Sequence, residues 1–229
     1  MIRGAMLAVA VMAALIGAAP IDSQIALERY ELELASLKVP KAMIFTYTVS
    51  QAGALSIEQR HRIYRSGENV RDETLFVDGE TLTQKIVTIS KRPDRYQIGR
   101  LAPRSTGYTM LFLRAQRDGS HVDYVYEARP LLATPAGFTV TRVTIDGISF
   151  LPKQIAFRST DGTIVGTGDL QYGKSGGFWV PLVASIAADV KGKPTRERIT
   201  WSDYRFPQSL PRSTFLSPKP IPTATLPPI

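Results

Sequence analysis

The spacing of apolar residues changes once along the chain, from a helical period to an alternating one. In residues 23–38, SQIALERYELELASLK, apolar side chains recur at three- and four-residue steps with charged side chains between them. This spacing predicts an amphipathic helix that ends at Val39-Pro40, because the residue before a proline disfavours helical backbone. From Lys41 onward the period becomes two, which is typical of a strand with one buried face.

The alternating pattern continues through most of the chain and predicts an antiparallel sheet. Turn sequences such as Gln-Ala-Gly, Ser-Gly-Glu-Asn and Asp-Gly separate the apolar runs, as they do in hairpins. The predicted strands are 41–50, 56–66, 70–79, 138–145, 152–159, 163–172, 178–190 and 196–206, with 82–90 and 96–101 as weaker candidates. Residues 108–131 fit two descriptions, because their first half suits a short helix and their second half, around 122–126, suits a strand.

Residues 178–190, FWVPLVASIAADV, form the clearest amphipathic strand of the chain. Its apolar even positions are Phe178, Val180, Leu182, Ala184, Ile186, Ala188 and Val190. The odd positions include Ser185 and Asp189. Pro181 has no N–H to donate to a neighbouring strand, so the strand lies at an edge, begins at Pro181, or contains a bulge there.

The closing strand, ITWSDYRF, changes phase in its middle. Ile199 and Trp201 are two residues apart, but the next large apolar residues, Tyr204 and Phe206, have the opposite parity. A β-bulge at Ser202-Asp203 adds one residue and brings these four side chains to one face. We therefore predict a bent strand whose rings line an apolar concavity.

The two ends of the chain differ in composition from the middle. Residues 5–19 form an apolar run after Arg3 that is about 22 Å long as a helix, shorter than a bilayer core of roughly 30 Å. This run and the small residues that end it predict a signal peptide over residues 1–22, with an uncleaved membrane tether as the alternative. Residues 207–229 contain 7 of the 16 prolines and are predicted to be extended or disordered.

Composition narrows the functional classes. Apolar residues make up 44% and charged residues 21% of the 229 residues, so we expect one buried core within residues 23–206. The chain has no cysteine, which excludes disulfides, thiol catalysis, Cys-ligated zinc and a thioether-linked lipid anchor. The net charge of +8 favours peripheral contact with an anionic membrane, and nucleic acid is not expected because the charge is spread along the chain.

Two motifs match catalytic patterns without the structural context that those patterns need. GDLQYGKS (168–175) fits a phosphate-binding loop and GKSGG (173–177) fits a nucleophile elbow, but a strand containing a proline follows instead of a helix. We interpret both as one glycine-rich hairpin. His61 and His121 are far apart and no tight carboxylate cluster accompanies them, so we expect no catalytic residues, no metal site and no cofactor. His61, between two arginines, is expected at the surface of its strand.

Three segments resemble the periplasmic lipoprotein carriers with the LolA/LolB-type fold. LPKQIAFRSTDGTIV (151–165) is similar to a hairpin of that family, GFWVPLVASI (177–186) to one of its strands, and ITWSDYRFPQSLPRSTF (199–215) to its closing strand and L-P-x-x-x-F ending. The resemblance covers residues 25–217. It implies a mainly β (α+β) fold, in which a curved antiparallel sheet forms an incomplete β-barrel covered by the N-terminal helix and by the candidate second short helix.

The residues and the resemblance together predict a secreted, periplasmic, monomeric and non-enzymatic protein that holds acyl chains of lipids or lipoproteins in an apolar cavity. The predicted lining residues are Phe45, Tyr47, Phe178, Val180, Leu182, Ile186, Trp201, Tyr204 and Phe206. In the family an arginine on an early strand matters for transfer, and Arg60, Arg62 and Arg65 are the candidates, expected at the cavity rim. A membrane-protein or lipoprotein partner is compatible with this role. The alternative is an envelope regulatory or structural module with a filled core, which binds a partner protein or an anionic polymer.

Overall fold

The computed structural model describes residues 21–53, 56–91, 102–132 and 137–216, which form one antiparallel sheet and one α-helix. Helix α1 spans Ser23–Ser36, and the Asp22 side chain caps it by accepting a hydrogen bond from the Gln24 N–H at 2.7 Å. The strands are β1 (Ala42–Ala52), β2 (Ile57–Ser66), β3 (Asn69–Val77), β4 (Glu80–Lys91), β5 (Tyr108–Asp118), β6 (His121–Pro130), β7 (Phe138–Ile145), β8 (Pro152–Ser159), β9 (Ile164–Ser175), β10 (Phe178–Val190) and β11 (Lys193–Arg205).

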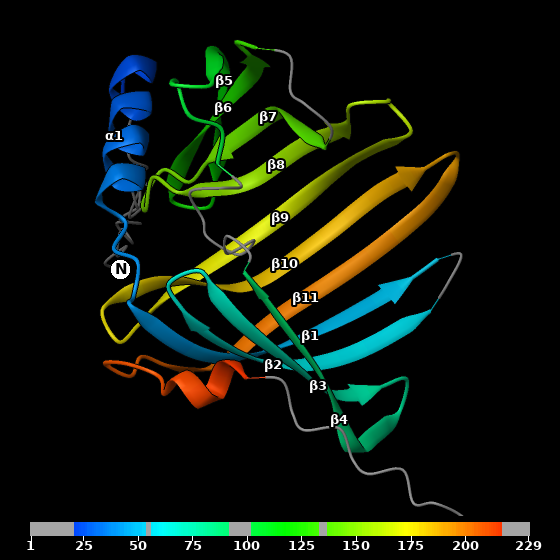
Figure 1. The fold of residues 1–229 in the computed structure, drawn as a ribbon. Coiled ribbons are helices and arrows are strands. Elements are labelled where there is room, and N and C mark those ends of the chain that lie inside the picture. Colours follow the sequence, from blue (N-terminus) through cyan, green and yellow to red (C-terminus); the bar gives the residue numbers. More distant parts are fainter. Residues whose placement is uncertain (1–20, 54–55, 92–101, 133–136, 217–229) are drawn as a thin grey trace, which may run out of the picture.

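The sheet consists of two antiparallel meanders, β1–β4 and β5–β11, which are joined by the pairing of β1 with β11. The strand order is β4-β3-β2-β1-β11-β10-β9-β8-β7-β6-β5, so the first and last strands are neighbours and β4 and β5 form the two edges. The sheet curves strongly, and α1 stands against the end formed by β5–β8 (Figure 1). The prediction of a curved antiparallel sheet, an incomplete barrel with a helix covering it, is confirmed.

Two details of the predicted strands need comment. The weak pattern of residues 82–90 does belong to a strand, β4, whereas 96–101 lies outside the described residues. The prediction of a second short helix within 108–131 was wrong, because this segment forms the hairpin of β5 and β6. The run of apolar residues in its first half reflects a strand at the edge of the sheet, in which the side chains of Leu111, Phe112 and Leu113 are all exposed.

Both predicted irregularities are β-bulges. Ile44 of β1 pairs with Arg205 and Thr46 pairs with Ser202, so three steps along β11 match two along β1. Asp203, inside this step, has a φ of 56°, and the bulge predicted at Ser202-Asp203 is confirmed. On β10 the register against β9 shifts between Pro181 and Val183, which accommodates the missing N–H of the proline.

The core lies on the concave face of the sheet, and α1 closes one half of it. Ala26, Tyr30 and Leu34 of the helix are buried, and Tyr30 donates a hydrogen bond from its hydroxyl to the Pro103 carbonyl at 2.8 Å. Tyr126 of β6 donates to the Ser23 carbonyl. Burial raises the pKa of Tyr126 to about 12, so its hydroxyl stays a hydrogen-bond donor at neutral pH.

Residues 207–216, the described part of the proline-rich segment, lie against the sheet rather than away from it. A short 3-10 helix, η1, spans Arg212–Phe215, and Arg71 of β3 donates a hydrogen bond to the Thr214 carbonyl at 3.2 Å. The description of this segment as extended or disordered was therefore wrong for these four residues of η1. Residues 217–229 lie outside the described part of the chain.

Candidate functional site

A pocket of about 610 Å³, lined by both polar and apolar residues, opens where β11 ends, beside the turn between β9 and β10. Its volume lies within the range of about 300–1,000 Å³ that is usual for small-molecule sites. The pocket is lined by Val39, Pro40, Lys41, Ala42, Ser175, Gly176, Phe178, Tyr204, Arg205, Phe206, Pro207 and Gln208. The lining thus combines the connection after α1, the start of β1, the β9–β10 turn and the end of β11.

A row of aromatic rings connects this pocket to the core. The ring centroids of Phe45 and Tyr204 are 5.5 Å apart, those of Tyr204 and Phe206 are 6.1 Å apart, and those of Phe206 and Phe178 are 4.8 Å apart. The Tyr204 hydroxyl donates to the Pro181 carbonyl at 2.7 Å, which fixes the ring in the row. The row begins at the buried Phe45 and ends at the open pocket.

The turn between β9 and β10 needs a glycine beside the pocket. Gly176 has a φ of 55°, and a Cβ at this position would lie 2.6 Å from the Phe206 ring. Glycine adopts this backbone conformation without strain and leaves room for the ring. The segment GKSGG therefore forms a strand-turn-strand hairpin, as predicted, since β9 ends at Ser175 and β10 starts at Phe178.

The structure divides the nine predicted lining residues into three groups. Phe178, Tyr204 and Phe206 line the pocket, and Phe45, Tyr47 and Trp201 are buried in the core on the concave face. On β10 the register shift at Pro181 breaks the single alternation that the sequence predicted. Trp179 before the shift and Ala184 after it contact the core, while Val180 is buried outside that cluster and Leu182 is 39% exposed. Ile186 is partly buried beside Gly168.

Solved structures match this arrangement, although no family model and no curated protein matches the sequence. A LolA superfamily protein from Nitrosomonas europaea superposes with a TM-score of 0.51 at 15% identity, over 86% of this chain and 99% of that chain. A putative outer membrane lipoprotein-sorting protein domain from Vibrio parahaemolyticus superposes with a TM-score of 0.52 at 14% sequence identity, over 85% of this chain and 97% of that chain. A DUF1329 family protein from Desulfovibrio piger superposes with a TM-score of 0.50 at 10% sequence identity, over 85% of this chain and 97% of that chain. The chain has a LolA-like fold.

The three arginines predicted at the rim of a LolA-like cavity do not lie together. Arg65 is buried on the concave side, where its Nη1 is 3.2 Å from the Met43 sulfur and its Nε donates to the Gly67 carbonyl. Arg60 and Arg62 have the opposite parity on β2 and lie on the outer face of the sheet. Arg65 is thus the member of the three that reaches the side of the sheet occupied by the core.

His61 is buried, and the expectation that it lies at the surface was wrong. Its ring stacks on Tyr47, with centroids 4.7 Å apart and planes 2° apart, and its Nδ1 is 2.8 Å from Asp72 Oδ1. The flanking arginines point outward because successive strand residues alternate between faces. The positive neighbours in the sequence therefore indicated the opposite face, not the environment of His61 itself.

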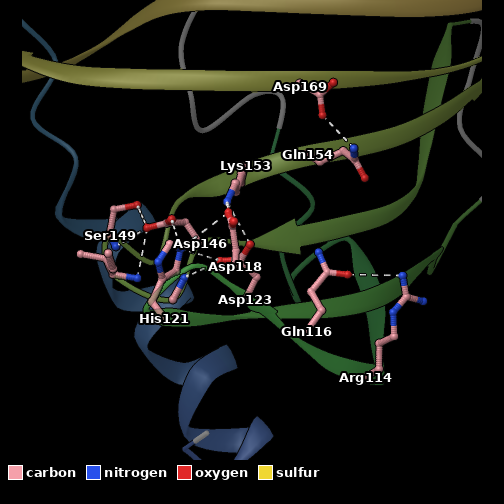
Figure 2. A network of polar contacts seen from close by, with 12 residues as sticks. Arg114, Gln116, Asp118, His121, Asp123, Asp146, Ser149, Lys153, Gln154 and Asp169 are labelled. Carbon is pink, nitrogen blue, oxygen red and sulfur yellow. Dashed lines mark hydrogen bonds and ion pairs between the residues drawn. The ribbon is translucent and has the colours of Figure 1, made fainter. Parts of the chain in front are cut away.

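A polar network links the β5–β6 hairpin to the β7–β8 connection and to β8 (Figure 2). Lys153 of β8 donates hydrogen bonds to Asp118 and Asp123, with 3.0 Å between its Nζ and Asp123 Oδ2. His121 Nε2 lies 3.3 Å from Asp123 Oδ1 and 3.6 Å from Asp146 Oδ2. The expectation that no carboxylate cluster accompanies the histidines was therefore wrong for His121. The spacing Asp-x-x-His-x-Asp within one hairpin was the signal that could have indicated it.

The network is the place where the described residues could most readily hold a metal ion. Ligand atoms of Asp118, His121 and Asp123 all lie within 4.8 Å of one another. However, the Lys153 ammonium binds both carboxylates, and Asp123 also accepts the Gly147 N–H at 3.2 Å. These protein groups already supply the positive charge and the hydrogen bonds that a buried carboxylate needs. We interpret the network as structural.

Proposed function

We propose that the protein is a non-enzymatic binding protein of the cell envelope that holds the acyl chain of a lipid or lipoprotein. The observation that carries this proposal is the pocket of about 610 Å³ at the end of the aromatic row, in which three of the predicted lining residues meet. Burial of each methylene group contributes about 0.8 kcal/mol, so one acyl chain supplies enough free energy for reversible capture without a covalent step.

The fold and the chain ends support an extracytoplasmic location for this activity. The LolA-like fold is shared with a lipoprotein-sorting protein domain, and the apolar segment near the N-terminus has the length of a signal peptide. In the described residues no helix has the length and apolar character needed to span a membrane. We propose a periplasmic protein that exchanges its ligand with a membrane-protein or lipoprotein partner.

A matched pair of substitutions on β10 tests the pocket. Phe178→Asp places a charge in the pocket, whereas Leu182→Asp places the same charge four residues away at an exposed position outside it. We expect Phe178→Asp to weaken binding of a fluorescent fatty acid at least tenfold, because it replaces the ring packed on Phe206 by a charge that an acyl chain would have to desolvate, and Leu182→Asp to bind as the wild type does. Both variants are checked for folding by thermal unfolding.

Lipid extraction from protein purified without detergent provides the second test. Native mass spectrometry and extraction should detect a co-purifying amphiphile in the wild type and less of it in Phe178→Asp. If neither a bound lipid nor quenching of Trp179 and Trp201 by a fatty-acid probe is found, the acyl-binding proposal is wrong.

A second candidate function, binding of a partner protein, is favoured by one observation. Strand β5 forms an edge of the sheet, and its consecutive residues Leu111, Phe112 and Leu113 are exposed. Exposed apolar edge strands readily pair with another chain. Phe112→Lys should abolish co-purification of a specific partner while leaving fatty-acid binding intact, and failure to affect a specific complex would exclude this edge as its binding site.

A further inference from the structure

Arginines gather on the outer face of the sheet over β2, β1 and β11. Residues paired across neighbouring antiparallel strands share a face, and the even-numbered residues of β1 from Ile44 to Ala52 point outward. Their partners on this face include five arginines, which are Arg60 and Arg62 on β2 and Arg196, Arg198 and Arg205 on β11. None of the five forms a salt bridge with another described residue, although Glu58 and Asp203 lie on the same face.

The bulge in β11 opens a small pocket within this arginine face. The pocket has a volume of about 280 Å³ and is lined by Ile44, Thr46, Arg62, Tyr64, Asp203 and Arg205. Arg62 and Arg205 belong to the two strands on either side of β1, so their side chains can approach one ligand from both sides. Two guanidinium groups and one carboxylate give the lining a net charge of +1, which matches a single negative charge on a ligand.

Thr46, a lining residue of this bulge pocket, has an unsatisfied hydroxyl. The residue is 6% exposed, and its Oγ1 is buried without a hydrogen-bond partner among the described residues. Buried polar groups in native proteins are nearly always hydrogen-bonded, so a buried hydroxyl without a partner needs an explanation. A ligand oxygen in the pocket would supply the missing hydrogen-bond partner of the Thr46 hydroxyl.

The bulge pocket and the larger pocket of about 610 Å³ share a residue. Arg205 lines both, while its neighbours Tyr204 and Phe206 line the larger pocket alone. Because alternate residues of a strand point to opposite faces, the end of β11 places aromatic rings on one side and a cation on the other. One amphiphile could therefore place its chain among the rings and its charged group near Arg205.

We propose that the bulge pocket binds the phosphate of an anionic lipid head group, and that the surrounding arginine face lies against a bilayer that contains such lipids. Arginine suits phosphate because its planar guanidinium donates two parallel hydrogen bonds. A phosphodiester carries one negative charge, as the lining requires. The small volume fits one head group and not a polymer. The link to an acyl chain rests on the proposed function, but binding of the phosphate does not.

Vesicle sedimentation tests the arginine face. Vesicles of phosphatidylcholine with phosphatidylglycerol are compared with pure phosphatidylcholine vesicles, at low and high salt. The wild type should bind the anionic vesicles more tightly, and high salt should weaken this binding. Arg62→Gln with Arg205→Gln should lower the affinity about 25-fold, at about fivefold per arginine. Arg114→Gln, on the distant β5, is the control and should bind as the wild type does.

Soluble glycerophosphoglycerol, a phosphodiester with the head-group chemistry of phosphatidylglycerol, tests the bulge pocket itself, without a bilayer or an acyl chain. Titration followed by nuclear magnetic resonance should show shifts of residues around Thr46 in the wild type. The Arg62→Gln, Arg205→Gln variant should lose them, whereas Arg196→Gln with Arg198→Gln, which removes the same charge from the same face, should keep them. Equal responses of the two double variants would show that the bulge pocket is not the phosphate site. If inorganic phosphate binds as tightly as the anionic vesicles do, the proposal that the phosphate belongs to a lipid head group is wrong.

Thr46→Val removes the buried hydroxyl and keeps the shape of the side chain. We expect several-fold weaker binding of glycerophosphoglycerol together with an unchanged or higher melting temperature, because an unsatisfied group is removed from the free protein. If Thr46→Val binds this ligand as tightly as the wild type does, the ligand does not contact the bulge pocket as proposed. Phe178→Asp separates the two proposals, since this variant should lose binding of the fatty acid and keep binding of glycerophosphoglycerol. Tighter binding to DNA or another polyanion than to the anionic vesicles would exclude the membrane as the partner.

Discussion

The two halves of the sheet use the same alternation of apolar and polar residues for different ends. Over β5–β8 the apolar face is sealed by α1, and Tyr30, Tyr126 and Ile145 are almost completely inaccessible to solvent. Over β10, β11 and β1 two bulges interrupt the pairing, and the aromatic row ends in an open pocket. The difference indicates that a covering element, not the pattern of the strands, decides whether an apolar face is sealed as core or ends in an open pocket.

The outer faces of the two halves also differ in charge. Around β6 and β8 the outer polar groups include the carboxylates of Asp118 and Asp123, which share the Lys153 ammonium, and Asp123 is only 1% exposed. On the outer face of β2 and β11, the side chains of Arg60, Arg62, Arg196, Arg198 and Arg205 form no salt bridge with a described residue. Carboxylates that share a nearby ammonium stabilise the fold, whereas surface charge without an ion-pair partner is available to a ligand.

The largest expected effect compares one tyrosine from each half. Tyr30→Ala removes a buried ring and its hydrogen bond under α1, and should lower the free energy of unfolding by about 4 kcal/mol. Tyr204→Ala, at the partly exposed pocket, should cost about half as much but weaken fatty-acid binding. Urea unfolding and probe titration of both variants measure this. Equal losses of stability would remove the distinction between the two halves.

Next in size is the loss of Lys153. Lys153→Met leaves the buried Asp123 carboxylate without its ammonium partner, and should lower the free energy of unfolding by about 3 kcal/mol at pH 7. Denaturant unfolding is the measurement. Adding Asp123→Asn should restore part of the stability, because the uncompensated charge is then gone. A variant as stable as the wild type would show that the network contributes nothing.

A smaller effect on stability is expected from replacing Glu73, which lies on β3 in the half of the sheet that α1 does not cover. Burial alone would raise the pKa of Glu73, but hydrogen bonds from Lys85 and Arg71 lower this pKa below 4.5. The carboxylate therefore stabilises the fold above pH 4.5, and this contribution is lost as the pH falls through the lowered pKa. Glu73→Gln should cost about 1.5 kcal/mol at pH 7 and less at pH 3. A difference that does not change with pH would contradict this.

The smallest expected effect has the opposite sign. Burial raises the pKa of Glu197, which pairs across the sheet with Ile186 and Gln51, so the charged form opposes folding. Glu197→Gln should raise the melting temperature slightly at pH 7, and the gain should vanish below pH 4.5, where the carboxyl is protonated also in the unfolded chain. A loss of stability at pH 7 would indicate that the carboxylate has a partner that favours its charge.

Local patterns in the sequence determined the elements and one of their irregularities. The apolar spacing of 23–38 predicted α1, alternation predicted most of the strands, and the phase change at Ser202-Asp203 predicted the bulge. Each of these is a property of consecutive residues. The edge strand β5 escaped the pattern because both of its faces carry apolar residues, so alternation no longer distinguished a strand from a helix.

Tertiary structure alone decided which of these residues line a pocket. Strand order brought β11 beside β1, and only then could Arg62 and Arg205 flank one pocket and Phe178 meet Phe206. The bulge at Pro181 reversed the faces along β10; the proline was compatible with an edge, a strand start or a bulge, and only the pairing with β9 decided between them. Side chains that come from strands far apart in the chain meet through hydrogen-bonded register, which no local period encodes.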